Sequence, residues 1–366
     1  MRALLCFIGG SGHLLPLIPI ARAAVAAGHE VAFSGPPGTL RRAGAAGFTV
    51  LHPDEPGEAP AEQAPQASEP PKRGPLEPLD IAREEAVMRD NFAGRAAPKR
   101  VETVLSVARK WQPDVIVSDE VDFGSQIAAE VLGLPRATVI TLGAGGFIRP
   151  DVVGEPLARL RAEHGLPAEA PEHLVITPFP ASFRDPGHPL PASAHAINQT
   201  PFVKRTAPPG EDPLVYVTLG TVFNRESGDL FERILAGLHQ APGIRVLVTV
   251  GEHIDPAEFG PQPPHVRIER FVDQALILPD ASLVISHGGS GSVVGALAHG
   301  LPAILLPMGA DQPHNAARCA ALGVARVLDA AQADPAQFRD TVMEMLRDPA
   351  YAEAARRMQH ELAAQP

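Results

Sequence analysis

Short apolar runs alternate with amphipathic segments through the first 34 residues, and glycines separate them. Residues 3–8 form a continuous apolar run typical of a buried strand, and residues 9–13 form a glycine-rich loop. Residues 14–27 have a helical pattern that Gly28 ends, and residues 30–34 are a second strand. A strand, a helix and a strand in this order predict a βαβ unit and therefore a parallel sheet.

The same alternation continues along the chain and begins again after a polar, proline-rich stretch at residues 198–213. The expected strands are 114–118, 137–142, 214–219, 245–250, 265–270, 283–286 and 303–306. The expected helices are 99–111, 126–132, 229–238, 333–347 and 350–362. The pattern predicts an α/β protein with two Rossmann-like, doubly wound domains. We assign residues 1–200 and 214–348 to the domains and 201–213 to the linker, and expect residues 349–366 to form a helix that packs back toward the N-terminal domain.

Composition and charge narrow the class of protein. The 366 residues are 45% hydrophobic and 20% charged, which is typical of globular domains, and the formal net charge of −11 argues against nucleic acid as a partner. The two cysteines, Cys6 and Cys319, are expected to be buried and reduced. Because the sequence has neither a membrane-length apolar run nor a secretory leader, we expect a cytoplasmic protein. We expect it to be a monomer or a homodimer. Residues 53–78 contain eight prolines and predict a long loop.

A glycine-rich elbow between residues 287 and 292 is the most informative motif. It follows an apolar strand and opens a helix of small residues, an order that builds an anion site, because glycines let the backbone approach and the helix N-terminus attracts phosphate. His287 and Ser292 flank the elbow as side-chain donors. Asp311 and Gln312 follow the next strand and suit sugar hydroxyls. The segment predicts a site for a nucleotide diphosphate sugar.

The first glycine loop differs from a dinucleotide fingerprint. It lacks the third glycine, and the second strand ends at Ser34 without an acid for a ribose, which disfavours a nicotinamide dehydrogenase. His13 instead lies where open α/β sheets bind ligands, at the end of the first strand. We expect the helix N-terminus to keep His13 neutral and able to accept a proton. Asp119, at the end of another strand, is the candidate that orients it.

These residues resemble the two-Rossmann (GT-B) glycosyltransferases of the UDP-glucuronosyl/glucosyltransferase-like family, especially the actinobacterial enzymes that glycosylate antibiotics. The similarity covers nearly the whole chain and is strongest at residues 1–31, 213–223 and 266–315. The resemblance implies that His13 is the general base and that Asp119 supports it. It also implies a donor site formed by Gly220, Thr221, Phe271, Val272, Gln274, His287, Gly288, Gly289, Ser290, Gly291, Ser292, Asp311 and Gln312.

Three positions depart from the family's pattern. Phe271 replaces the usual tryptophan and keeps a stacking face, whereas Asp273 replaces a proline. Gly295 stands where plant members carry a glutamate that binds the ribose. Because a glycine cannot accept hydrogen bonds from ribose hydroxyls, this departure favours a dTDP-sugar over a UDP-sugar.

The resemblance and the site chemistry together predict an inverting, metal-independent glycosyltransferase with a nucleotide-sugar co-substrate and no other cofactor. The acceptor is expected to be a small natural product, bound near Phe92 and Phe147 and by residues 53–78, 88–92 and 143–147. A metal mechanism would need clustered carboxylates, and the candidates Asp119, Glu120 and Asp122 are better explained as base support and solvated loop. Two alternatives remain: a sugar-nucleotide epimerase of the same architecture, and a non-catalytic protein that binds the donor for a second enzyme.

Overall fold

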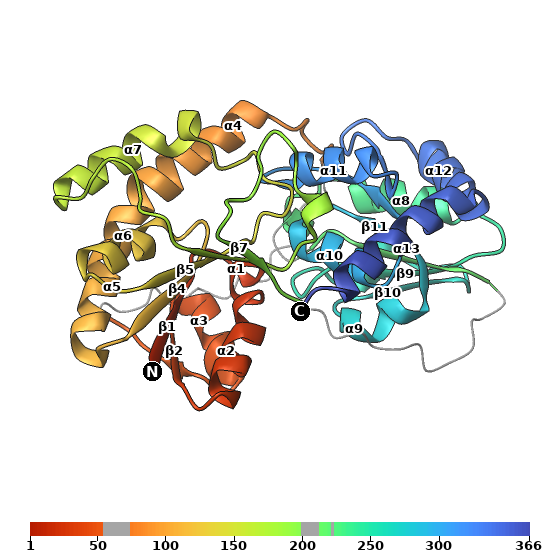
Figure 1. The fold of residues 1–366 in the computed structure, drawn as a ribbon. Coiled ribbons are helices and arrows are strands. Elements are labelled where there is room, and N and C mark those ends of the chain that lie inside the picture. The colour runs from red at the N-terminus through yellow and green to blue at the C-terminus, as the bar shows by residue number, and fades with distance from the viewer. Residues whose placement is uncertain (54–73, 199–211, 221–222) are drawn as a thin grey trace.

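The computed structural model describes residues 1–53, 74–198, 212–220 and 223–366. Two parallel sheets lie side by side, one from each half of the chain (Figure 1). The first has the order β3-β2-β1-β4-β5-β6-β7, and the second has the order β10-β9-β8-β11-β12-β13. The predicted fold class, two Rossmann-like domains, is therefore confirmed. Residues 54–73, most of the predicted loop, and most of the predicted linker lie outside the described residues.

The strands of both sheets are short and pair in parallel register throughout. Those of the first sheet are β1 (Arg2–Cys6), β2 (Glu30–Ser34), β3 (Thr49–Val50), β4 (Val115–Asp119), β5 (Arg136–Val139), β6 (Leu174–Thr177) and β7 (Ala194–Ala196). Those of the second are β8 (Leu214–Thr218), β9 (Arg245–Thr249), β10 (Val266–Glu269), β11 (Ala281–Ser286), β12 (Ala303–Leu305) and β13 (Ala325–Val327).

Strand β1 shows why the first sheet is covered on both faces. Ala3, Leu5 and Phe7 contribute to a core with helices α1 (Ser11–Leu14), α2 (Leu17–Ala26) and α3 (Pro37–Ala45). Leu4 and Cys6 point the other way, because successive side chains alternate across a strand. They join a core with α5 (Ala97–Trp111), α6 (Phe123–Val131) and α7 (Pro150–Glu163). The continuous apolar run is thus what a strand buried on both faces requires.

The second sheet is also covered on both faces. Helices α8 (Leu230–Leu238) and α12 (Pro335–Arg347) share one core with its central strands. Helices α10 (Ser290–Ala298), α11 (Gln312–Ala321) and α13 (Pro349–Ala363) share another, which includes Phe179 and Phe183 from the first half. One hydrophobic core therefore crosses between the two halves of the chain.

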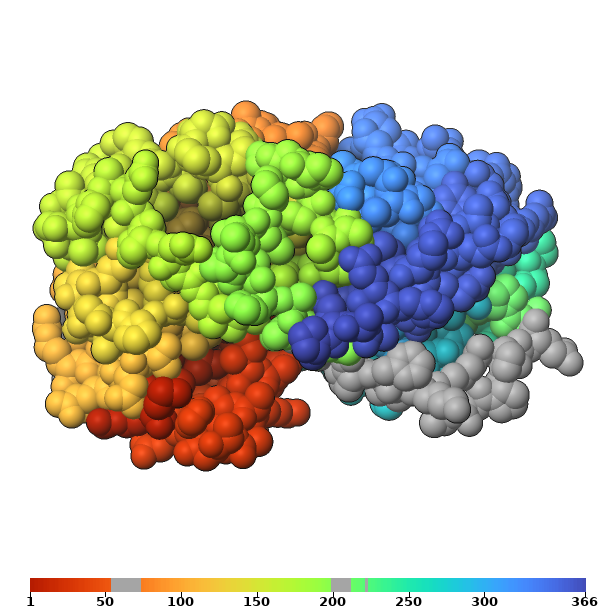
Figure 2. Space-filling model, viewed as in Figure 1, coloured from red at the N-terminus to blue at the C-terminus, as the bar shows by residue number. Residues whose placement is uncertain are grey.

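The C-terminal helix α13 reinforces this connection. Figure 2 shows it, in dark blue, running across the surface from the second half to the green segment of the first. Glu361 accepts hydrogen bonds from the backbone nitrogen of Ser182, at 3.1 Å, and from its hydroxyl, at 2.5 Å. The last helix thus fixes how the two sheets face each other.

Several elements differ from the sequence-based expectation. The helix expected at residues 14–27 is split into α1 and α2 around Pro16, because proline has no N–H and interrupts a helix. Helices α3 and α7 were not predicted, since Gly38, Gly154 and Pro156 lie inside them and weaken the helical pattern. The segment from α4 (Ile81–Ala86) through a π-helix (Val87–Ala96) to α5 was predicted only at its end.

Candidate active site

The first half of the site is a pair of residues at neighbouring strand ends. His13 lies in α1, shortly after β1, and Asp119 is the last residue of β4, which pairs with β1. Nδ1 of His13 is 3.4 Å from Oδ1 of Asp119; the aspartate side chain is fully buried and that of the histidine is 21% exposed. The distance is that of an ion pair, although the contact does not meet the geometry of a hydrogen bond. The structure thus brings the expected base and its support together.

The backbone holds Asp119 in place. Its Oδ2 accepts a hydrogen bond from Ile8 N at 2.9 Å, and its Oδ1 accepts from Val121 N at 2.7 Å and Asp122 N at 3.1 Å. The imidazole of His13 lies against Gly9, whose φ is +92° and where a Cβ atom would come within 2.8 Å of the ring. A side chain at position 9 would therefore be strained and would displace the His13 ring.

The expectation that a helix N-terminus keeps His13 neutral is wrong in sign. Helix α1 has only four residues, and three carboxylates act on the ring. Burial alone lowers the pKa of His13, but the charge of Asp119, with those of Asp311 and Glu120, outweighs burial and raises this pKa above its usual 6.5. The surroundings therefore favour the imidazolium form of the ring.

Glu120 and Asp122, expected in a solvated loop, are instead structural. Asp122 is fully buried, pairs with Arg100 at 2.8 Å and accepts from Ser125 N at the start of α6. Glu120 Oε1 accepts from the backbone nitrogens of Thr141, at 2.7 Å, and Leu142, at 2.6 Å. Burial raises the pKa of Glu120 to about 7 despite these bonds. Their oxygens hold other parts of the N-terminal half in place.

The second half of the site is the glycine elbow between β11 and α10. A Cβ atom at Gly220, whose φ is +76°, would come within 2.6 Å of His287 Cε1, and one at Gly289 would come within 2.4 Å of its Nε2. The imidazole is thus enclosed between the end of β8 and the start of α10. Burial lowers the pKa of His287 to about 4, so the ring is neutral near pH 7. Thr221, the other residue expected in this loop, lies outside the described residues.

Ser290, expected on the donor, uses its hydroxyl elsewhere. It donates to Asp311 Oδ2 at 2.6 Å and accepts from Gly143 N at 2.8 Å and from Asn315 Nδ2 at 3.0 Å. Asn315 Nδ2 is also 2.7 Å from Asp311 Oδ2, and its Oδ1 accepts from Ala144 N at 3.0 Å. The sequence interpretation missed Asn315, although it lies four residues after Asp311 and so on the same face of α11.

The remaining elbow residues leave room in front of the helix. Gly291 is exposed, and a Cβ atom there would meet nothing within 4 Å. Ser292 is half-buried in the first turn of α10, and Gly288 has a φ of +84°. Gln312 is buried, and its Oε1 accepts from the backbone nitrogens of Met308, at 2.8 Å, and Gly309, at 3.2 Å. The side-chain oxygen of Gln312 therefore holds the loop at residues 308–309 in place and does not face a ligand.

The segment expected to bind the nucleobase is partly open. Phe271 is 67% exposed, and Val272 and Gln274 are half-buried beside it. Asp273, which departs from the proline that the resemblance implies, accepts from Ala275 N at 3.0 Å and caps the short helix α9 (Gln274–Ile277). The exposed aromatic face is available for stacking.

The residues expected to bind the acceptor are more deeply buried than side chains that line an open pocket would be. Phe147 is 4% exposed, contributes to the N-terminal core and has its ring 6.1 Å from that of His314. Phe92 is half-buried in the π-helix and packs against the same core. Residues 142–147 are buried throughout and meet the second half of the chain at Gly143 and Ala144.

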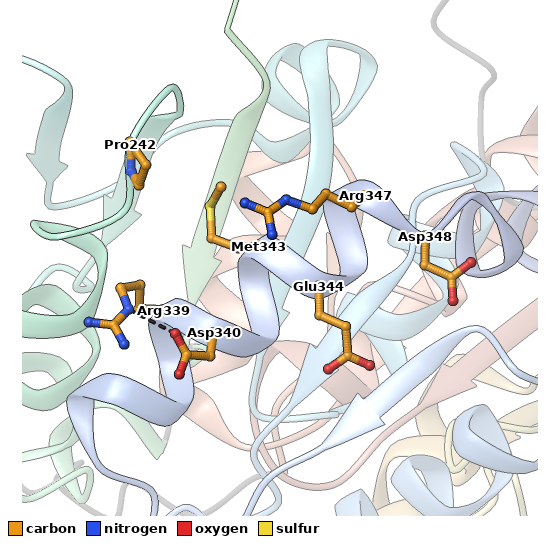
Figure 3. A pocket seen from close by; sticks show the side chains of 7 residues that line it. All are labelled: Pro242, Arg339, Asp340, Met343, Glu344, Arg347 and Asp348. Carbon is orange, nitrogen blue, oxygen red and sulfur yellow. Dashed lines mark hydrogen bonds and ion pairs between the residues drawn. The ribbon is translucent and has the colours of Figure 1, made fainter.

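Two cavities lie outside this site. A groove of about 710 Å³ follows α12 and is lined by Arg339, Asp340, Met343 and Arg347, with the first two paired at 2.8 Å (Figure 3). A second, of about 300 Å³, lies between α6 and α7 and includes Phe123, four residues after Asp119. Neither is lined by a residue of the predicted catalytic pair or donor set.

The described ranges have neither a candidate metal cluster nor a candidate membrane span. They contain no group of three or more His, Cys, Asp or Glu side chains that could hold a metal ion. None of the helices within those ranges is long and apolar enough to cross a bilayer.

Similarity to known proteins covers the whole chain. The family model for the erythromycin biosynthesis protein CIII-like C-terminal domain matches residues 244–366. The elloramycin glycosyltransferase ElmGT of Streptomyces olivaceus is 30% identical over 394 residues, which span 100% of this chain and 94% of that protein. The 10-deoxymethynolide desosaminyltransferase of Streptomyces venezuelae is 28% identical over 418 residues, with coverages of 100% and 94%.

Solved structures share the fold. Spinosyn rhamnosyltransferase SpnG complexed with thymidine diphosphate gives a TM-score of 0.82 at 24% identity, covering 100% of this chain and 97% of that chain. The glycosyltransferase SnogD from Streptomyces nogalater gives a TM-score of 0.75 at 25% identity, with coverages of 100% and 96%. Two facing Rossmann-like domains of this kind define the GT-B class of glycosyltransferase. Within that class, the chain belongs to the family of actinobacterial antibiotic glycosyltransferases.

Proposed function

We propose that this chain is an inverting, metal-independent glycosyltransferase that moves a deoxysugar from a nucleoside diphosphate to a hydroxyl of a small natural product. The observation that carries the proposal is the meeting of the two half-sites. His13, backed by Asp119 at 3.4 Å, belongs to the first sheet domain, and Asp311, from the second, raises the pKa of His13 by its charge. A carboxylate from the second domain is therefore near enough for its charge to act on His13 of the first.

His13 is the general base in this proposal. Because its Nδ1 faces the carboxylate of Asp119, we assign the proton of the neutral ring to Nδ1, which leaves the lone pair of Nε2 for the acceptor. Nε2 takes the proton of the acceptor hydroxyl as its oxygen attacks the anomeric carbon. The bond to the diphosphate breaks on the opposite face, so the configuration inverts. Asp119 stabilises the imidazolium without taking up the proton.

The donor diphosphate is placed at the N-terminus of α10. Backbone N–H groups there have no partner within the helix, and the helix dipole favours negative charge. Gly291 leaves this end open, and its neighbours Gly289 and Ser290 begin the helix. Stabilising the departing diphosphate in this way is electrostatic catalysis, and it needs no divalent ion. Asp311 and Gln312, at the following loop, are assigned to the hydroxyls of the donor sugar.

The assignment of the donor's sugar and nucleotide rests on relatives of this chain and on one residue, Gly295. The aclacinomycin-T 2-deoxy-L-fucose transferase of Streptomyces galilaeus is 27% identical over 418 residues and, by its name, transfers a deoxysugar. Gly295 lies in α10 beside Gln274 of the segment assigned to the nucleobase, and it offers no carboxylate to a ribose. We therefore assign a dTDP-sugar as the donor.

Incubation of the purified protein with dTDP- and UDP-sugars and a library of aglycones, read by mass spectrometry, tests the function. A glycosylated product with inverted configuration supports it. Sugar-nucleotide isomerisation without an aglycone would instead identify an epimerase, and nucleotide binding without turnover would identify an auxiliary protein. A His13→Ala variant in parallel separates catalysis by this site from contaminating activity.

A further inference from the structure

A third glycine-rich loop joins the two domains. Residues 143–146 follow β5 and read Gly-Ala-Gly-Gly. The backbone N–H of Gly143 donates to Ser290 Oγ at 2.8 Å, and that of Ala144 donates to Asn315 Oδ1 at 3.0 Å. Both acceptors are buried in the second domain, so these bonds cross the interface where water does not compete for them.

The loop is held firmly on the side of the N-terminal domain. A Cβ atom at Gly143 would come within 2.6 Å of Phe179 and 2.8 Å of Phe183, whose rings stack with centroids 5.6 Å apart. Glu120 accepts from the two preceding backbone nitrogens, and the Arg184 guanidinium donates to Leu142 O at 3.3 Å. The two N–H groups that reach Ser290 and Asn315 are thus presented by a rigid platform.

The hydroxyl of Ser290 is fully used by these contacts. A serine hydroxyl has one proton to donate and two lone pairs to accept with. Its proton goes to Asp311, and its lone pairs take Gly143 N–H and the Asn315 amide. It therefore has no donor left for a diphosphate, and the backbone N–H remains the group that Ser290 can offer there.

We propose that Ser290 and Asn315 are positioning residues that couple docking of the N-terminal domain to the orientation of Asp311. The inference rests on the proposed function, because Asp311 is assigned there to the donor sugar. Asp311 Oδ2 is held by Ser290 Oγ at 2.6 Å and by Asn315 Nδ2 at 2.7 Å, and the loop's N–H groups fix the orientation of both partners. When the domains separate, Ser290 Oγ and Asn315 Oδ1 lose these N–H partners, and only the contacts within the second domain remain, among them the bond from Asn315 Nδ2 to Gly288 O at 3.0 Å. The sugar-binding carboxylate is therefore fully ordered only in the docked state.

The test uses Ser290→Ala and Asn315→Ala, with Ser106→Ala as the control. Ser106 lies on α5, so this control makes the same Ser-to-Ala change away from the contact between the domains. Calorimetry with dTDP and UDP gives nucleotide affinity, and small-angle scattering with and without nucleotide gives the radius of gyration. Steady-state transfer gives kcat and KM for wild-type protein and each variant.

We expect both interface variants to bind dTDP within about threefold of wild type, because the side chains do not contact the donor. Their kcat should fall about tenfold or more, because Asp311 is no longer held in place. Their radius of gyration with nucleotide should exceed that of wild type, because a hydrogen bond between the domains is lost in each variant. The Ser106→Ala control should match wild type in every readout.

Three outcomes would overturn the proposal. A loss of nucleotide affinity that parallels the loss of kcat/KM would make Ser290 a donor ligand. An unchanged kcat in both variants would make the contact incidental, and a wild-type radius of gyration would show that docking does not depend on it. Affinity and scattering need no turnover, so the docking role can be judged even if the protein transfers no sugar.

Discussion

Asp119 is oriented independently of His13. Its two carboxylate oxygens accept three backbone hydrogen bonds, from Ile8, Val121 and Asp122, at 2.7 to 3.1 Å, before the histidine is counted. The imidazole then lies 3.4 Å from one of those oxygens. Replacing His13 should leave the Asp119 carboxylate in place. Replacing Asp119 removes both the backbone hydrogen bonds that it accepts and its contact with His13.

We predict that His13→Ala lowers the transfer rate by about 10²–10⁴-fold, the usual contribution of a general base. Nucleotide affinity should hardly change, because the diphosphate site is formed by the other domain. Turnover with a natural acceptor, together with calorimetric titration of dTDP, checks both parts. A loss below about tenfold would mean that the residue is structural.

Asp119→Asn should move the pH profile as well as lower the rate. His13 must be neutral to accept a proton, so kcat/KM rises with pH through its raised pKa. Removing the charge of Asp119, the largest influence that raises this pKa, should shift the acid limb of the profile to lower pH. An acid limb at the same pH as in wild type would show that a group other than His13 controls this part of the profile.

The same variant should also be less stable. An asparagine has one acceptor oxygen, so its amino group must face a backbone N–H that Asp119 now accepts, at a cost of about 1–3 kcal/mol. The raised pKa of His13 stabilises the fold below pH 6.5, and this contribution is lost as pH rises through the folded-state value. Urea unfolding of wild type and variant at pH 5.5 and pH 8.5 should therefore differ most at the lower pH.

Gly289→Ala should destabilise the protein through His287. A Cβ atom at position 289 would lie 2.4 Å from Nε2 of the enclosed ring, so we expect a loss of about 1–3 kcal/mol in urea unfolding. In a His287→Ala background most of this loss should disappear. Gly291→Ala, two residues further along the same helix and facing open space, is the matched control and should be neutral or slightly stabilising. Additive losses in the double variant would contradict the contact.

The sequence predicts the parts of this molecule whose signals are local. Residues 3–8, which include most of β1, are a continuous apolar run, and the elbow at residues 287–292 carries its glycines in order, so both are visible without tertiary information. Helix α7 was missed because Pro156 and Gly154 weaken its pattern, and packing against the π-helix stabilises it instead. In α7, tertiary contacts outweigh a low intrinsic helix propensity.

Roles that depend on distant partners could not be read from the sequence. Nothing near Ser290 indicates that its hydroxyl meets Gly143, 147 residues away. The pKa of His13 was predicted with the wrong sign, because the charge of Asp119, together with those of Asp311 and Glu120, outweighs burial, and this sum depends on how the folded chain places the three carboxylates. Glycine-rich loops in the sequence indicate where a site lies. The protonation of its side chains depends on which charged groups the folded domains bring near them.

Transfer should persist in excess EDTA. The proposed site neutralises the diphosphate with helix N–H groups, so chelation should leave kcat within about twofold of the untreated value. Adding magnesium or manganese back to the chelated enzyme is the control. Activity that collapses with chelator and returns with either ion would contradict the proposed mechanism.

The last prediction concerns the nucleotide and Gly295. Wild type should bind dTDP more tightly than UDP, because no carboxylate at this position rewards the 2′-hydroxyl of a ribose. Gly295→Glu should raise the affinity for UDP relative to dTDP by about tenfold, the equivalent of one hydrogen bond of roughly 1.4 kcal/mol. A Cβ atom there would lie 3.3 Å from Leu278 Cδ1, so that side chain must shift slightly. Gly295→Ala measures the cost of this shift, and Gly295→Gln separates the charge from the shape of the new side chain. Tighter binding of UDP by wild type would overturn the dTDP assignment. An equal gain for both nucleotides in the glutamate variant would show that the carboxylate does not reach the 2′-hydroxyl.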